Sequence, residues 1–127
     1  MPVYEKKPWL KFYGDIPEHI DYPRVTMYEA LMQTIQRCPD DVAYDFFGTT
    51  STYRQFGEEI DWCADALASL GMTKGDRITI SMPTCPQAII CFYAANKLGA
   101  VASMIHPLSP AKEIEFYLNT AKSRFAL

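Results

Sequence analysis

The residues best suited to nucleophilic or acid–base catalysis do not form a recognised pattern. A nucleophilic serine needs flanking glycines for a sharp turn, or a histidine and an acid within reach. Ser81, Ser103 and Ser109 have no flanking glycines. The sequence around His19 and His106 does not suggest a catalytic triad either. We therefore expect no catalytic residue within this chain.

Cysteine and glycine spacing also argues against a metal or nucleotide site. The four cysteines, Cys38, Cys63, Cys85 and Cys91, include no CxxC pair, which is the spacing typical of zinc sites. We interpret them as reduced thiols of an intracellular protein. The glycines form neither a GxGxxG turn nor a phosphate loop ending in GK(S/T). The sequence thus predicts no metal-binding and no cofactor-binding residue in this chain.

His106 lies at a position where a ligand-binding residue could occur. His106 follows an apolar run, and ligands of open α/β sheets bind at the edge formed by the carboxyl ends of the strands. Residues 82–86 occupy the equivalent loop after the preceding apolar run. The simpler interpretation, which we prefer, is structural: His106 caps a turn together with Pro107, and residues 82–86 form a rigid turn that starts a helix.

Composition and charge exclude several classes of protein. The chain has 127 residues, 49% of them hydrophobic, and a formal net charge of −3. It is therefore globular and lacks the basic excess that nucleic acid binding requires. The N-terminus has no apolar stretch typical of a signal peptide, and Pro83 and Pro86 interrupt the uncharged segment 78–96. We expect a cytoplasmic protein with no membrane span and no nucleic acid partner.

The middle of the chain predicts a buried parallel sheet. Residues 78–111 contain a single formal charge, at Lys97, and strands buried on both faces read as continuous apolar runs. We expect central parallel strands at 77–82 and 100–105. The helix between them, at 86–98, is apolar on almost all sides, which indicates a position between the sheet and a further layer.

The remaining elements follow from capping and turn signals. Thr26 and Glu29 form a capping box for a helix at about 27–37, and Gly48 joins two β-prone runs, 42–47 and 49–52, in a short hairpin. Thr52 caps a helix at 53–70 that ends at Gly71. The expected apolar stripe of this helix comprises Tyr53, Phe56, Ile60, Cys63, Leu67 and Leu70, and its carboxylates, Glu58, Glu59, Asp61 and Asp65, form a solvated face.

The end of the chain predicts one more helix and one more strand. Ser109 and Pro110 form the N-cap and first turn of a helix to about Lys122. Its inward-facing residues are Ile114, Tyr117, Leu118 and Ala121. Residues 124–127 begin a third parallel strand. Because the sequence stops inside an apolar strand, we interpret it as a fragment of a larger N-terminal domain.

Together these elements give an α/β fold of βαβαβ order, with helices on both faces of a parallel sheet. Residues 1–24 are expected to form an extended N-terminal arm, because Pro2, Pro8, Pro17 and Pro23 prevent a helix there. Residues 25–127 then form a single truncated α/β subdomain with a short hairpin. Because the fragment lacks the further layer that would cover the apolar helix at 86–98, we expect an exposed apolar surface and therefore self-association.

Several segments, read in order, resemble one enzyme family. They are 52–56 (TYRQF), 66–80 (ALASLGMTKGDRITI), 83–87 (PTCPQ), 97–101 (KLGAV) and 106–110 (HPLSP). The set resembles the early part of the AMP-forming acyl-CoA synthetases, which belong to the adenylate-forming superfamily. Gln87 and Ser109 depart from it, since the family commonly has Glu and Asn there. Residues 7–13 and 21–23 look like the arm of long-chain fatty-acid-CoA ligases.

The resemblance implies a two-step ligase in the full-length protein. ATP and a carboxylic acid, here a fatty acid, give an acyl-adenylate, and coenzyme A then displaces AMP. ATP, Mg²⁺ and coenzyme A are implied for the full-length enzyme, and none is expected on this fragment. The family's phosphate loop and catalytic Lys have no counterpart in residues 1–127, so we expect a scaffold without activity of its own.

Two other functions fit the residues alone. The first is a free-standing, non-enzymatic α/β module that binds a partner protein through its apolar layer. The second is a small flavodoxin-like nucleotide or flavin binder. The second is less favoured, because the loops carry prolines where backbone N–H donors would be needed for phosphate.

Overall fold

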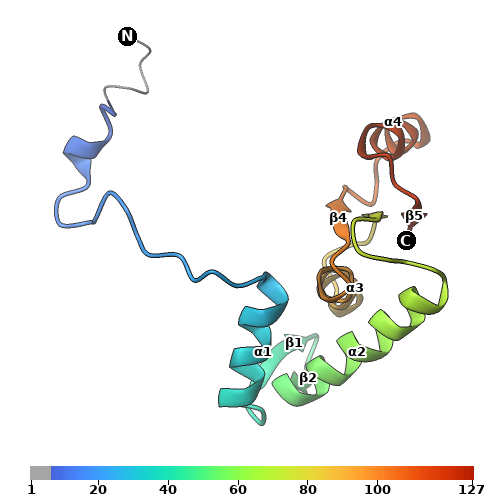
Figure 1. The fold of residues 1–127 in the computed structure, drawn as a ribbon, viewed down its shortest axis with the longest axis horizontal. Helices are drawn as coiled ribbons and strands as arrows, with labels where there is room; N and C mark the ends of the chain where they lie inside the picture. Colours follow the sequence, from blue (N-terminus) through green and yellow to red (C-terminus); the bar gives the residue numbers. More distant parts are fainter. Residues whose placement is uncertain (1–6) are drawn as a thin grey trace.

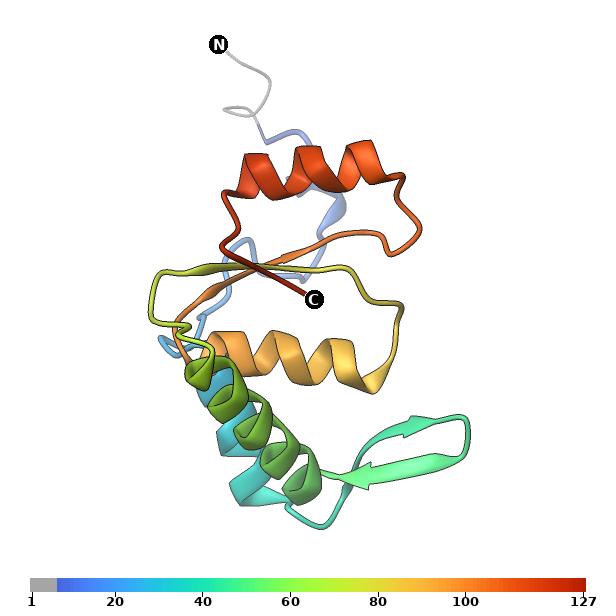
Figure 2. The same cartoon turned by 90° about the vertical axis from the view of Figure 1, so that its right-hand side faces the viewer.

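A three-stranded parallel sheet is the centre of the fold. The computed structural model describes residues 7–127. Strands β3 (Arg77–Ile80), β4 (Val101–Met104) and β5 (Phe125–Ala126) have the order β4-β3-β5, and both pairs are parallel. Helix α3 (Pro86–Lys97) covers one face and α4 (Ala111–Ala121) the other (Figure 2). The predicted α/β fold with helices on both faces is confirmed.

The central strand β3 holds the core together. Ile78 and Ile80 are 0% exposed, and they contact the cluster formed by the helices on one side of the sheet. Thr79 points to the other face and is also buried, where its Oγ1 lies 2.6 Å from Oγ of Ser123. A buried hydroxyl needs such a partner, because an unpaired one carries a desolvation cost.

A layer of helices packs behind α3. Helix α2 (Tyr53–Ser69) crosses α3, and α1 (Met27–Arg37) lies beside both (Figure 1). The small residues Ala64, Ala94 and Ala95 are almost completely buried, and small side chains let helix backbones approach closely. The backbone N–H of Tyr28 donates to Oδ1 of Asn96 at 2.8 Å, which fixes the start of α1 to the end of α3.

Both predicted N-caps of the early helices are present. Oγ1 of Thr26 accepts from the N–H of Glu29 at 3.1 Å, and the Glu29 carboxylate accepts from the N–H of Thr26 at 2.6 Å. Thr52 and Gln55 make the same reciprocal pair at the start of α2, with distances of 3.3 and 2.9 Å. Each pair satisfies two backbone donors that the helix leaves free.

The predicted hairpin is also confirmed. Strands β1 (Val42–Phe46) and β2 (Thr49–Thr52) pair antiparallel. The two turn residues, Phe47 and Gly48, have φ of 52° and 83°, the left-handed values that two-residue hairpin turns require. Glycine adopts this conformation without strain, and the Oδ1 of Asp45 accepts from the N–H of Gly48 at 2.8 Å.

The expectation that 100–105 is a central strand is wrong for the chain described. Strand β4 lies at an edge of the sheet, with Val101 54% and Met104 50% exposed. An apolar run shows that a strand can be covered on both faces, but it does not show how many neighbours pair with the strand. The expected strand at 77–82 is shorter than predicted and ends at Ile80.

Two details of the helices also differ from the sequence-based expectation. Leu70 does not join the apolar stripe of α2 and is 67% exposed, because the chain leaves helical geometry there and turns at Gly71, whose φ is 86°. Ser109 is not the N-cap of α4. The N-cap is Pro110, whose carbonyl accepts from the N–H groups of Glu113 and Ile114, while the N–H of Ser109 donates to the carbonyl of His106.

The late helix and strand are otherwise as predicted. The half-buried side chains of α4 include the four expected to face inward, and β5 pairs with β3. Of the predicted arm, residues 1–6 lie outside the described part of the chain. Residues 7–25 form one short 3-10 turn, Leu10–Phe12, and otherwise an irregular segment that leads away from the helices (Figure 1).

Shortening a side chain of the central strand is expected to destabilise the domain. We predict that Ile78→Ala lowers the free energy of unfolding by about 2–5 kcal/mol, because it leaves a cavity in a fully buried site. Urea titration followed by circular dichroism measures this change. The control Leu70→Ala, at an exposed position, is expected to change it by less than about 0.5 kcal/mol. Equal effects would contradict the assigned core.

Candidate functional site

The carboxyl edge of the sheet is the place where the fold can bind a ligand. The chain leaves β3 toward α3, on one face, and leaves β4 toward α4, on the other (Figure 2). The two loops therefore diverge between adjacent parallel strands. Such a point of divergence opens a crevice, and ligands of open α/β sheets characteristically bind there.

A cavity of about 220 Å³ lies at this point. It is lined by Met82, Pro83, Thr84, Cys85, Ala88, Ile89, Phe92 and Met104. The loop after β3, the first turns of α3 and the end of β4 each contribute to this wall. Thr84 and Cys85 alone bring polar side chains, so the cavity suits an apolar group.

A second hollow of about 150 Å³ continues from the first. The two share Thr84, Cys85 and Ile89, and the second reaches Tyr44, Asp45 and Phe46 of the hairpin. We call the two together the switch-point groove. It runs from the edge strand, around the amino end of α3, to the hairpin. Residues 82–85 lead from β3 through a bend at Thr84 and Cys85 into α3, which begins at Pro86 as predicted, and residues 82–86 line the groove.

His106 does not line the switch-point groove. Its side chain is exposed, and Nδ1 accepts from the N–H of Leu108 at 3.2 Å. The hydrogen bond closes the turn that follows β4. This contact supports the structural interpretation of His106 over a ligand-binding one.

The groove lacks the features that bind phosphate or Mg²⁺. Helix α3 starts with Pro86, which has no N–H, and the side chain of its N-cap, Cys85, makes no capping hydrogen bond. A phosphate at a helix N-terminus needs several free N–H donors. Among residues 7–127 there is also no group of three His, Cys, Asp or Glu side chains that could hold a metal ion. The start of α3 therefore does not offer the donors that a phosphate needs.

The acidic face of α2 is solvated, as predicted, and two of its members make structural contacts. Oδ1 of Asp61 lies 2.7 Å from Nζ of Lys97, which joins α2 to α3. This hydrogen bond is the main reason that the pKa of Lys97 is raised. The hydroxyl of Tyr44 donates to Glu59 at 2.9 Å and ties the hairpin to α2. Glu58 and Asp65 are exposed.

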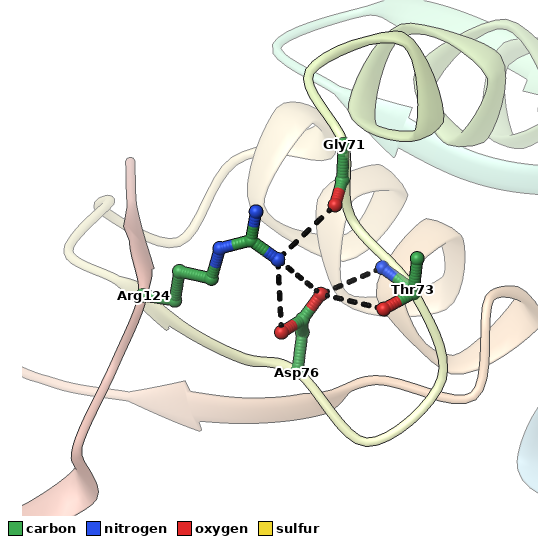
Figure 3. A network of polar contacts seen from close by, with 4 residues as sticks. All are labelled: Gly71, Thr73, Asp76 and Arg124. Carbon is green, nitrogen blue, oxygen red and sulfur yellow. Dashed lines mark hydrogen bonds and ion pairs between the residues drawn. The ribbon is translucent and has the colours of Figure 1, made fainter.

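A polar network closes the opposite, amino edge of the sheet (Figure 3). Nη1 of Arg124 donates to the carbonyl of Gly71 at 3.2 Å and to the two carboxylate oxygens of Asp76 at 3.3 and 3.1 Å. Asp76 also accepts from the N–H of Thr73 at 2.7 Å and from its hydroxyl at 3.0 Å. The network fastens the loop before β3 to the start of β5.

The same contacts set the charge of Asp76. The hydrogen bond from the backbone N–H of Thr73 is the largest cause that lowers the pKa of Asp76, and the Thr73 hydroxyl and Arg124 lower it further. The sequence reasoning missed this network. The spacing of Thr73 and Asp76 is a turn signal that could have indicated its local half, but nothing local indicates Arg124.

Comparisons with known proteins agree on one family. The model of the family described as "AMP-binding enzyme" matches residues 31–127. A long-chain-fatty-acid–CoA ligase of Bacillus subtilis is 32% identical over 121 residues, which are 94% of this chain and 22% of that protein. The ligase FadD13 of Mycobacterium tuberculosis is 40% identical over 76 residues, 60% of this chain and 15% of its own. The chain thus spans about a fifth of such relatives.

Solved structures show the same relationship. The N-terminal subdomain of Klebsiella oxytoca NpsA, in complex with anthranilyl-AMSN, matches with a TM-score of 0.77 and 30% identity over 80% of this chain and 26% of that one. The inhibitor-bound N-terminal domain of FACL13 from Mycobacterium tuberculosis matches with a TM-score of 0.76 and 34% identity, over 80% and 26%. No helix in residues 7–127 is both long and apolar enough to cross a bilayer.

The polar network predicts a pH-dependent contribution to stability. Because folding lowers the pKa of Asp76, its contribution is present above the unfolded carboxyl pKa of about 3.9 and is lost as the pH falls through the folded value. We expect Asp76→Asn to lower Tm at pH 7, and the gap to the parent chain to shrink at pH 3. Thermal unfolding followed by circular dichroism measures both. The exposed control Asp65→Asn should show no such gap, and a gap of constant size for Asp76→Asn would contradict the assignment.

Proposed function

The chain belongs to the AMP-binding enzyme family, and we propose that it forms the first α/β subdomain of an AMP-forming ligase that joins a carboxylic acid to coenzyme A. The family match over residues 31–127 carries this proposal. The ligases that match over nine-tenths or more of this chain support it. Their alignment favours the ligase over a free-standing interaction module.

The proposed reaction solves a simple chemical difficulty. A carboxylate at neutral pH is a poor electrophile until it carries a good leaving group. The acid first attacks the α-phosphate of ATP to give an acyl-adenylate and pyrophosphate, and the thiol of coenzyme A then displaces AMP to give a thioester. Mg²⁺ would offset the charge of the phosphates, and we place its site outside this chain, because the family's phosphate loop has no counterpart in residues 1–127.

The role that we propose for this chain is to position the site rather than to react. Helices α3 and α4 hold the sheet from its two faces, and the switch-point groove presents an apolar wall at the edge where ligands bind. Fatty acids are the substrates we favour, because several matching relatives are named long-chain-fatty-acid–CoA ligases. We propose a cytoplasmic location for the reaction, since ATP and coenzyme A are available there.

Activity is expected from the complete gene product and not from this chain. The product of the complete gene should convert palmitate, ATP and coenzyme A to thioester with release of AMP and pyrophosphate. Formation of ADP, or no dependence on coenzyme A, would contradict the ligase. Residues 1–127 alone should show no acid-dependent exchange of labelled pyrophosphate into ATP. Exchange above the rate without acid would overturn the scaffold role and leave the ligase standing.

The exposed apolar groove leads us to propose self-association of this chain. Ile89 lines both hollows and is partly exposed, and apolar patches of this kind drive association. Sedimentation of residues 1–127 should show a dimer or larger species. We expect Ile89→Glu to weaken association at least about tenfold, because a charge would be buried without a partner. The control Phe116→Glu, on α4, should not. A monomer at moderate concentration would contradict the proposal.

A further inference from the structure

Helices α2 and α3 bring two thiols into contact across their interface. Sγ of Cys63 lies 3.8 Å from Sγ of Cys91. Cys63 is half-buried, and Cys91 is 9% exposed. We propose that this pair is a modification site, where a small disulfide such as oxidised glutathione joins α2 to α3 through an intramolecular disulfide bond. The proposed ligase reaction does not use either thiol.

The two helices already hold the sulfur atoms in place. The ion pair of Asp61 and Lys97, at 2.7 Å, crosses the same interface, and Ala64 and Ala95 are buried close to it. These contacts fix the helices without help from the thiols. A disulfide bond needs its two sulfur atoms about 2 Å apart, so the Sγ atoms of Cys63 and Cys91, now 3.8 Å apart, must approach each other but the two helices need not dock anew.

The exposure of the two residues sets the order of the reaction. Cys63 is the more accessible, so its thiolate attacks a sulfur of oxidised glutathione, forms a mixed disulfide and releases one glutathione thiolate. Cys91 then loses its proton to solvent and attacks Sγ of Cys63, which expels the second glutathione thiolate. Two protein thiols are oxidised to one disulfide, and one glutathione disulfide is reduced to two thiols.

Burial of Cys91 opposes its ionisation, and the neighbouring Cys63 thiol adds to this effect until the first step is complete. Burial, followed by the neighbouring Cys63, raises the pKa of Cys91 to about 12. In the mixed disulfide Cys63 no longer carries a thiol, so that cause is removed at the step where Cys91 must ionise. Burial and the neighbouring Cys85 remain as causes, and because the thiolate is the nucleophile, we expect the second step to be slower than the first.

The other two cysteines provide an internal comparison. Sγ of Cys38 donates to the carbonyl of Thr34 at 3.3 Å, at the end of α1. Cys85 is half-buried at the start of α3 and is close enough to raise the pKa of Cys91. Cys85 is therefore the rival partner for Cys91.

The test is oxidation of the full 127-residue chain with oxidised glutathione at low protein concentration. We expect loss of two of the four thiols, a mass lower by two hydrogen atoms, and a proteolytic fragment that joins Cys63 to Cys91. The oxidised chain should unfold at a Tm higher by roughly 5–10 °C. The bond closes the loop between Cys63 and Cys91, which lowers the conformational entropy of the unfolded chain. Cys38→Ser, which leaves three thiols, should still lose two of them, form the same cross-link and show the same rise in Tm.

The variants make the outcome decisive. Cys63→Ser should remove the cross-link, and the same oxidation in concentrated urea should scatter pairing over all four cysteines, which shows that the fold selects the pair. The proposal is overturned by a bond to Cys85 or Cys38, by a glutathione adduct on Cys63 that never resolves, by disulfide-linked dimers, or by four unreacted thiols. A lower Tm after closure would also overturn it, because the helices would then not be in position.

Discussion

The burial of β3 on both faces is the constraint on which the rest of the structure depends. Ile78 and Ile80 need apolar cover on one side, and Thr79 needs both cover and a hydrogen-bond partner on the other. A parallel sheet meets this need by placing its crossover helices on opposite faces. Once α3 and α4 occupy those faces, the loops after β3 and β4 must diverge, and the crevice between them follows from the topology.

Much of this arrangement could be predicted because its signals are local. The capping boxes at Thr26 and Thr52 and the left-handed turn at Gly48 each depend on residues within a few positions. The edge position of β4 could not be predicted, because an apolar run reports the cover on the faces of a strand and not its pairing. The N-cap at Pro110 was also not predicted. We expected the side chain of Ser109 to accept hydrogen bonds from the first turn of α4, but the backbone carbonyl of Pro110 accepts them instead.

The candidate site, too, was predictable only in part. The sequence places residues 82–86 between a strand and a helix, so the location of the groove could be predicted. Its lining could not, because Phe92, Met104 and Phe46 come from three separate elements that meet only in the folded chain. The part of the groove at the carboxyl edge of the sheet is lined mainly by apolar side chains, and the chain that forms it spans about a fifth of the length of the ligases it matches.

The order of the strands has a consequence for biosynthesis. Both neighbours of β3 follow it in the chain, β4 directly and β5 after a further crossover. During synthesis, Ile78 and Ile80 therefore leave the ribosome before either pairing partner does. At ordinary elongation rates, β5 is synthesised roughly 2–10 s after β3. During that interval α1, α2 and the hairpin have already been synthesised, and they can cover the apolar side chains of β3.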